Sequence, residues 1–125
     1  MENIVIFHLK RIWGGKDLWE EIKSKRKTSE WRDLTNYWCK RLLRDYEKVF
    51  LFIPTETIEE AEAKGTSINL TEYLKTTKAW FVIGYPKHCV PRLEADITGL
   101  LAWPKKNSAQ SQFEIKITNV KELPS

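Results

Sequence analysis

Lys27, Glu30 and Arg32 are the residues whose types and spacing are best suited to chemistry. If the chain after Lys27 is extended, Glu30 and Arg32 share one strand face, because side chains two positions apart point the same way. Lys27, at the turn into that strand, can reach the same pocket. An ammonium, a carboxylate and a guanidinium that converge there can transfer a proton or hold an anion.

Each of the three residues has two interpretations. Lys27 can act as a general base or nucleophile, or as a fixed cation for a phosphate or carbonyl oxygen. Glu30 can orient Lys27 or shuttle a proton, or it can form a structural pair with Arg32. The forked donors of Arg32 suit an anion, but this residue can also simply keep Glu30 ionised.

This segment resembles the motif of the ASCH domains, which are relatives of the PUA domain. Their pattern is Gly-x-Lys-x-x-Glu-x-Arg at the junction of a helix and a strand, and Lys27, Glu30 and Arg32 match three of its four fixed positions. The similarity extends to the flanking segments Phe7-His8-Leu9-Lys10, Asn36-Tyr37-Trp38 and Gly84-Tyr85-Pro86-Lys87. Residues 55–78 have no counterpart in the family.

The fourth fixed position of the pattern is a glycine, and this chain has Lys25 there. The substitution predicts one of two local structures, because glycine is the usual residue where φ is positive. Either the turn is made without a positive φ, or Lys25 accepts some backbone strain.

The resemblance implies a single ASCH-like domain over residues 1–125, of the small bacterial or phage type, that binds RNA or a nucleotide in a cleft floored by the motif. It also implies an alternative. Some small ASCH proteins hydrolyse the amide of an acetylated cytidine, with the motif lysine catalytic, and others have been described as ribonucleases. In an enzyme of this kind Lys27 and Glu30 would be the catalytic pair. The amidohydrolases, however, have a threonine where Glu30 stands and a further glutamate that we do not place.

Aromatic and basic residues near the motif are candidates for ligand binding. Trp31, Tyr37 and Trp38 can stack on bases, and Tyr37 is the best candidate because Trp38 belongs to the apolar stripe of a helix. Tyr85 and Lys87 lie in a segment between strands, where loop residues often carry binding.

The net charge of +4 is unevenly distributed along the chain. From His8 to Lys48 there are 12 Lys or Arg residues against 7 Asp or Glu, whereas from Pro54 to Lys78 there are 3 against 5. The basic surplus therefore accompanies the motif, and a locally basic surface attracts polyanions.

Several other classes of site are absent from the sequence. Gly14-Gly15-Lys16 lacks the remaining residues of a P-loop, and the chain has no Gly-x-Ser-x-Gly, HExxH or Cys-x-x-Cys pattern. His8, Cys39, His88 and Cys89 have no metal-binding spacing, so we expect no metal and no cofactor. Without a long apolar run or a signal peptide, we expect a cytoplasmic protein with no membrane partner and free thiols.

The pattern of elements predicts an α+β fold, namely a small PUA-like mixed β-barrel with short helices. We expect about five strands, at residues 4–10, 48–53, 79–85, 96–103 and 113–120, with the last two forming a closing hairpin. Helices are expected after Asp17 and Thr35, whose side chains can cap them. Residues 55–78 read as a mildly acidic helical insertion, with helix starts near Thr57 and Asn69, that covers one end of the barrel.

Overall fold

The computed structural model describes residues 4–85 and 91–124 of the chain. Its strands are β1 (Ile4–Leu9), β2 (Ile12–Trp13), β3 (Lys16–Asp17), β4 (Ser29–Asp33), β5 (Ile68–Asn69), β6 (Lys78–Ile83), β7 (Arg92–Trp103) and β8 (Gln112–Leu123). Its helices are α1 (Leu18–Lys23), α2 (Asn36–Leu42), α3 (Tyr46–Phe52) and α4 (Thr55–Lys64), with the 3-10 turns η1 (Thr71–Tyr73) and η2 (Ser108–Gln110). Within the described ranges, none of the helices is long and apolar enough to cross a membrane.

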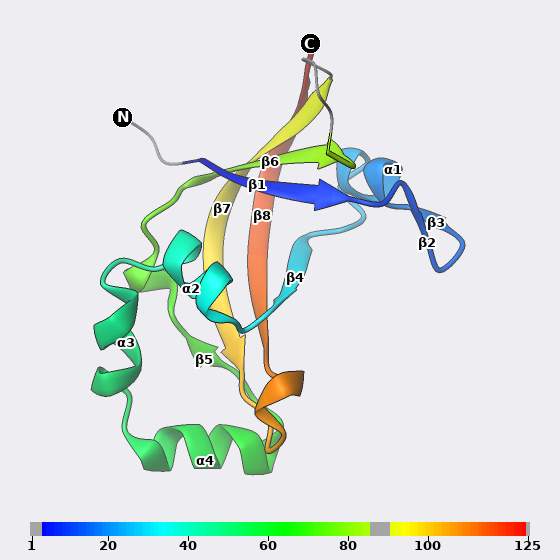
Figure 1. The fold of residues 1–125 in the computed structure, drawn as a ribbon. Helices are drawn as coiled ribbons and strands as arrows, with labels where there is room; N and C mark the ends of the chain where they lie inside the picture. The colour runs from blue at the N-terminus through cyan, green and yellow to red at the C-terminus, as the bar shows by residue number, and fades with distance from the viewer. Residues whose placement is uncertain (1–3, 86–90, 125) are drawn as a thin grey trace.

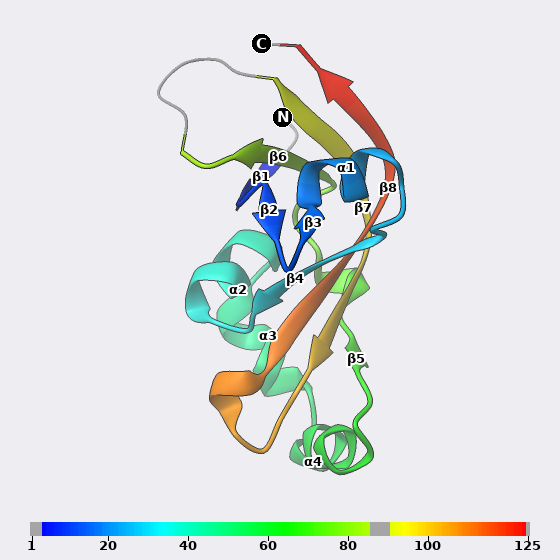
Figure 2. The same cartoon turned by 90° about the vertical axis from the view of Figure 1, so that its right-hand side faces the viewer.

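A curled sheet in the order β1-β6-β7-β8-β4 forms the body of the molecule, and β5 pairs with β7 beside this path. β1 runs parallel to β6, and the other strand pairs of this sheet are antiparallel. The register of the β7–β8 hairpin shifts twice, between Glu94 and Asp96 and between Ile97 and Gly99. Such irregularities bend strands and increase their twist, and the sheet curls into a half-barrel (Figures 1 and 2). The expected α+β class, a mixed barrel-like sheet with short helices, is confirmed at this level.

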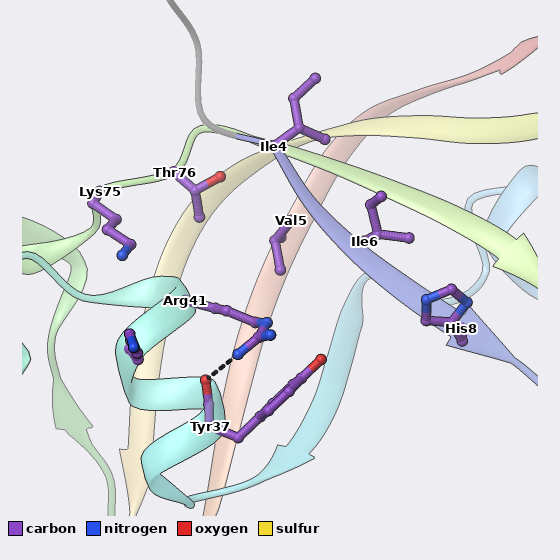
Figure 3. Close-up of a pocket in the computed structure, with 9 residues that line it drawn as sticks. Ile4, Val5, Ile6, His8, Tyr37, Arg41, Lys75 and Thr76 are labelled. Atoms are coloured by element: carbon purple, nitrogen blue, oxygen red, sulfur yellow. Dashed lines mark hydrogen bonds between the residues drawn. The ribbon is translucent and has the colours of Figure 1, made fainter. Parts of the chain in front are cut away.

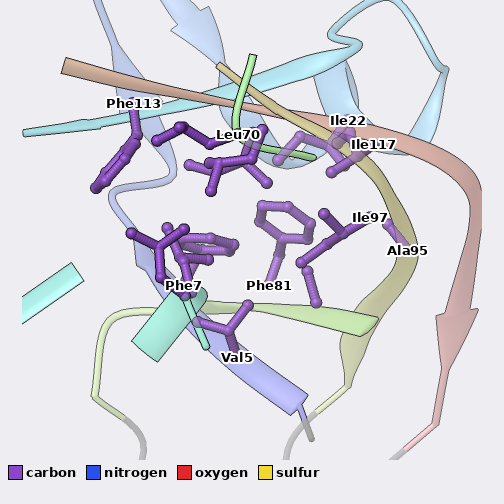
Figure 4. Packing of buried hydrophobic residues seen from close by; sticks show 14 of the residues in the cluster. Val5, Phe7, Ile22, Leu70, Phe81, Ala95, Ile97, Phe113 and Ile117 are labelled. Carbon is purple, nitrogen blue, oxygen red and sulfur yellow. The ribbon is translucent and has the colours of Figure 1, made fainter. Parts of the chain in front are cut away.

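The core fills the concave side of the half-barrel. Phe113, Ile115 and Ile117 of β8 are buried, and Glu114 and Lys116 between them are not, as their alternation predicts. They meet Phe7 of β1 and Phe81 of β6 in one apolar cluster (Figure 4).

The two edge strands of the curled sheet, β1 and β4, approach each other without forming a ladder. α2 lies beside this open seam (Figure 1) and contributes Cys39 and Leu42 to the core. The guanidinium of Arg32 in β4 reaches across to β1, where its Nη2 lies 3.5 Å from the carbonyl oxygen of His8.

The two predicted helix caps are confirmed. The Asp17 carboxylate accepts a hydrogen bond from the backbone N–H of Glu20, and the Thr35 hydroxyl accepts one from the backbone N–H of Trp38. Both satisfy a donor that the first helical turn leaves open. Cys39 of α2 is a free thiol, and burial raises its pKa, which keeps it protonated. Cys89 lies outside the described residues.

The strand expected at residues 48–53 is wrong, because this segment is the helix α3. A short apolar run does not by itself distinguish a strand from a helix. Only Val49 of α3 is buried, whereas Leu51 is 80% exposed and Phe52 is 67% exposed. No strand of the described sheet pairs with this segment, and its backbone groups pair within a helix instead.

The helical insertion expected at residues 55–78 is right only for its first half. α4 begins at Thr55, two residues before the predicted start, and Gly65 ends it with a positive φ of 65°. The chain then forms the short strand β5 and the turn η1, where the Asn69 side chain accepts a hydrogen bond from the N–H of Thr71. α4 lies near the end of the half-barrel where the β7–β8 hairpin turns (Figure 1).

Candidate functional site

Strand β4 places Glu30 and Arg32 on the concave face of the sheet. Glu30 is opposite Ile115 and Arg32 is opposite Phe113, and both partners are fully buried core residues. Residues directly opposite each other in an antiparallel pair point to the same face. The predicted pair therefore lies at the border of the apolar core rather than on an outer surface.

Lys27, Glu30 and Arg32 form one ion-pair network. The Nζ of Lys27 donates to Glu30 Oε2 at 3.0 Å, and the Nε of Arg32 lies 3.4 Å from Glu30 Oε1. Glu30 is 5% exposed, whereas the two cationic side chains keep about a quarter of their surface in solvent, at 24% and 23%. The carboxylate is thus held between two opposite charges, as a buried charge requires. The expected convergence of the three residues is confirmed.

Aromatic rings fix the position of the Arg32 guanidinium. Its central carbon lies 5.1 Å from the centre of the Phe7 ring and 5.3 Å from that of the Trp38 ring. A planar guanidinium interacts favourably with aromatic faces at such distances. Arg32 therefore joins β4, β1 and α2, and this joining role is one that spacing along the sequence does not reveal.

The turn that leads into the motif uses a left-handed residue. Lys25 has a φ of 66° and follows the last turn of α1, which is the usual place for a left-handed residue after a helix. Of the two alternatives for this position, the strained one is correct. The backbone here adopts the conformation that the glycine of the ASCH pattern would adopt without strain.

A pocket of about 620 Å³ opens over this network, and we call it the motif pocket. Its lining includes Lys27, Glu30 and Arg32 together with His8, Trp13 and Trp38. Trp13 comes from the β2–β3 hairpin, is 61% exposed and lies 5.0 Å from the ammonium of Lys10. The volume of the motif pocket suits a ligand of the size of a nucleotide.

The structure changes the roles expected for the neighbouring tryptophans. Trp31 is opposite Glu114 in the β4–β8 pair, so its ring lies on the other face of β4, where it packs 6.0 Å from the Trp103 ring. It contributes to the rim of the motif pocket but does not face the Lys27–Glu30–Arg32 network. Trp13, which the sequence did not single out, is the exposed indole on the side of the network.

Tyr37 lines a second pocket of about 560 Å³ between β1 and α2, which we call the basic pocket. Its lining includes Ile4 and Ile6 of β1, Lys40 and Arg41 of α2, and Lys75 (Figure 3). Tyr37, the predicted stacking residue, therefore lies outside the lining of the motif pocket. Trp38 lines the motif pocket, although its place on the helix stripe had favoured the core alone.

His8 lines both pockets. Its imidazole stacks on the ring of Tyr85 at 4.1 Å, and its Nδ1 lies 2.7 Å from the carbonyl oxygen of Gly84. Tyr85, a predicted binding residue, is 83% exposed and thus extends an aromatic surface from His8. The predicted contribution of Lys87 lies outside the described residues.

In another charged cluster, on the strands β6, β7 and β8, the carboxylates pair with donors of the same cluster. The Trp80 indole N–H donates to Glu94 at 3.0 Å and lowers the pKa of that carboxyl, and Lys121 contributes to the same shift. Lys78 lies 2.6 Å from Asp96 and lowers its pKa in turn. No group of three possible metal ligands occurs within residues 4–85 and 91–124, and His88 and Cys89 are outside those ranges.

Comparisons with protein-family models, with curated proteins and with solved structures found no match to this chain. The ASCH resemblance therefore depends on the residues of the motif and its flanks.

Proposed function

We propose that this protein is an ASCH-like domain of the PUA-like type that binds RNA or a nucleotide in the motif pocket. The observation that carries the proposal is the network of Lys27, Glu30 and Arg32 at the floor of a nucleotide-sized pocket. Glu30 holds the two cations in place, and cations held this way are suited to phosphate or carbonyl oxygens. The exposed Trp13 beside them offers a stacking surface for a base.

The test is a titration of the purified protein with nucleoside monophosphates and short RNAs at several salt concentrations. Each phosphate neutralised on a single strand contributes about 0.7 to the slope of log affinity against log salt. Lys27→Ala should weaken binding to all sequences alike. Lys106→Ala removes an exposed lysine at the far turn of the β7–β8 hairpin and serves as the matched control. Binding that ignores salt, or that Lys27→Ala leaves unchanged, would contradict the proposal.

A small hydrolase is the second candidate, and the contact between Lys27 and Glu30 favours it. In such an enzyme Lys27 would first give a proton to Glu30, 3.0 Å away, and the neutral amine would then accept a proton from the attacking water. Glu30 would return its proton to the leaving nitrogen or oxygen, which restores the charged pair. Under this alternative the substrate would be the amide of a modified nucleoside or an RNA phosphodiester, as the resemblance implies.

The variant Lys27→Arg separates the two candidates. Arginine keeps the positive charge but does not lose its proton near pH 7. A binding domain should therefore retain most of its affinity. An enzyme should still bind but turn over nothing, so affinity and product formation are measured on the same ligand. Wild-type turnover that disappears in Lys27→Arg while affinity persists would reject the pure binding domain.

A further inference from the structure

The basic pocket has the lining of a site for a polyanion with flat groups. Lys40 and Arg41 of α2 supply two cations, and Lys75 also lines the pocket. Ile4 and Ile6, which are 38% and 42% exposed, add an apolar wall from the outer side of β1. Cations gathered on one open surface attract phosphate groups.

Arg41 and Tyr37 form a planar platform within this pocket. The central guanidinium carbon of Arg41 lies 3.3 Å from the centre of the Tyr37 ring, and its Nη1 donates to the Tyr37 carbonyl oxygen at 3.2 Å. Both side chains extend from α2 toward β1 (Figure 3). This hydrogen bond uses one of the five N–H donors of the guanidinium. Tyr37 is 53% exposed and can stack on a base while Arg41 pairs with a phosphate.

The two pockets adjoin at His8, which lines both of them. The stacked rings of His8 and Tyr85 lie at this junction and present a further flat surface. A chain of linked nucleotides repeats a phosphate and a base at each step, which matches a row of alternating cationic and aromatic sites. A duplex keeps its bases stacked and paired, and hence does not offer their faces to such rings.

We infer that the ligand is a single-stranded polynucleotide that spans both pockets, rather than a lone nucleotide in the motif pocket. One nucleotide occupies the motif pocket, the strand passes His8, and the neighbouring phosphates and bases are held by Lys40, Arg41 and Tyr37. This inference rests on the proposed function and specifies its substrate class.

The test compares uridine 5′-monophosphate with hexauridylate in the wild type and in the double variant Lys40→Gln/Arg41→Gln. We expect the wild type to bind hexauridylate at least about tenfold more tightly, since each added stacking contact has an effect of that order. The double variant should lose most of this ratio, keep its affinity for the monophosphate, and reduce the salt slope by about 1.4 for two phosphates. The control Lys64→Gln/Lys106→Gln removes the same charge outside both pockets and should change none of these values. Urea unfolding of each variant shows that the fold is retained.

Four results would overturn the inference. The first is equal affinity of the wild type for hexauridylate and the monophosphate, and the second is a ratio of these two affinities that the double variant leaves unchanged. The third is a loss of affinity for the monophosphate in the double variant that equals its loss for hexauridylate. The fourth is competition by polyglutamate as strong as that by hexauridylate. The last would identify an acidic peptide as the occupant. If the wild type binds the monophosphate but does not bind hexauridylate more tightly, only this inference fails. If it binds neither ligand, the proposed function is rejected as well. Hexathymidylate, measured in parallel, distinguishes RNA from single-stranded DNA.

Discussion

The motif pocket and the basic pocket adjoin at His8, yet they hold their charges in opposite ways. The lining of the motif pocket includes the cations of Lys10, Lys27 and Arg32 and the carboxylates of Glu30 and Asp33, and Glu30 lies between two of the cations. In the basic pocket, Lys40 and Arg41 line an open surface, and no carboxylate is among the described residues of its lining. The first arrangement orders its cations through a buried partner, whereas the second presents Lys40 and Arg41 on an open surface.

This difference separates two tasks that one basic surface could combine. A compensated network offers fixed hydrogen-bond directions and little net field, which suits selection of one chemical group. Cations on an open surface attract a polyanion at long range, which increases the rate of encounter and depends strongly on salt. On this view, the motif pocket decides which ligand binds and the basic pocket decides how tightly a charged strand is held.

The largest expected effect tests whether Glu30 organises the motif pocket. Glu30→Gln leaves Lys27 and Arg32 close together without their shared carboxylate. We expect a loss of about 2–3 kcal/mol in the free energy of unfolding, because the two cations keep part of their hydration, whereas breaking a fully buried pair costs about 3–5 kcal/mol. Urea unfolding at pH 7 measures the change.

Glu60→Gln provides the matched control for this experiment. Glu60 pairs with Lys64 on α4, where both side chains are more than half exposed, at 62% and 64%. An exposed pair of this kind contributes about 0.5 kcal/mol or less. Similar losses for Glu30→Gln and Glu60→Gln would show that Glu30 carries no special structural role.

A smaller effect distinguishes the two arginines that contact aromatic rings. Arg32→Lys keeps the charge but loses the planar contact with Phe7 and Trp38 and the reach to the His8 carbonyl oxygen. We expect a loss of about 1–2 kcal/mol in stability, because this contact is largely removed from water and joins the two edges of the sheet.

Arg41→Lys is the corresponding change in the basic pocket. Arg41 and its partner Tyr37 are both exposed, so its loss should cost about 0.5 kcal/mol or less. The two variants are compared by thermal and urea unfolding under one set of conditions. If Arg41→Lys were the more destabilising of the two, the basic pocket rather than the seam would depend on its arginine for stability.

The smallest effect concerns the backbone that supports each pocket. The basic pocket lies against a helix with a capped start, whereas the motif pocket follows a turn in which Lys25 has a φ of 66°. Lys25→Gly should stabilise the protein by about 0.5–1 kcal/mol, because glycine adopts this conformation without the steric cost of a Cβ.

Ser24→Gly, one residue earlier, is the control for Lys25→Gly. Ser24 has a φ of −79°, so glycine there brings only a greater loss of entropy on folding and should destabilise slightly. Opposite signs for the two changes in urea unfolding would support the assignment of strain to Lys25. The same sign for both would contradict it.

The sequence by itself predicted those features that depend on neighbours along the chain. The alternation of Phe113, Ile115 and Ile117 predicted a half-buried strand, and Asp17 and Thr35 predicted helix starts. The convergence of Lys27, Glu30 and Arg32 was predictable for the same reason, since a turn and the period of a strand set which side chains share a face. These are local rules with short range, and they held here.

Tertiary structure decided what local rules leave open. The apolar run at residues 48–53 suited a strand or a helix equally, and in the structure it is α3, of which only Val49 is buried. The curl of the sheet brought β1 against α2 and Lys75, which are about 30 to 70 residues apart in sequence, and so created the basic pocket. It also placed Trp38 at the motif pocket. Side chains distant in sequence meet only when the whole sheet has closed, so burial and long-range packing, rather than the residue types alone, determined the candidate site.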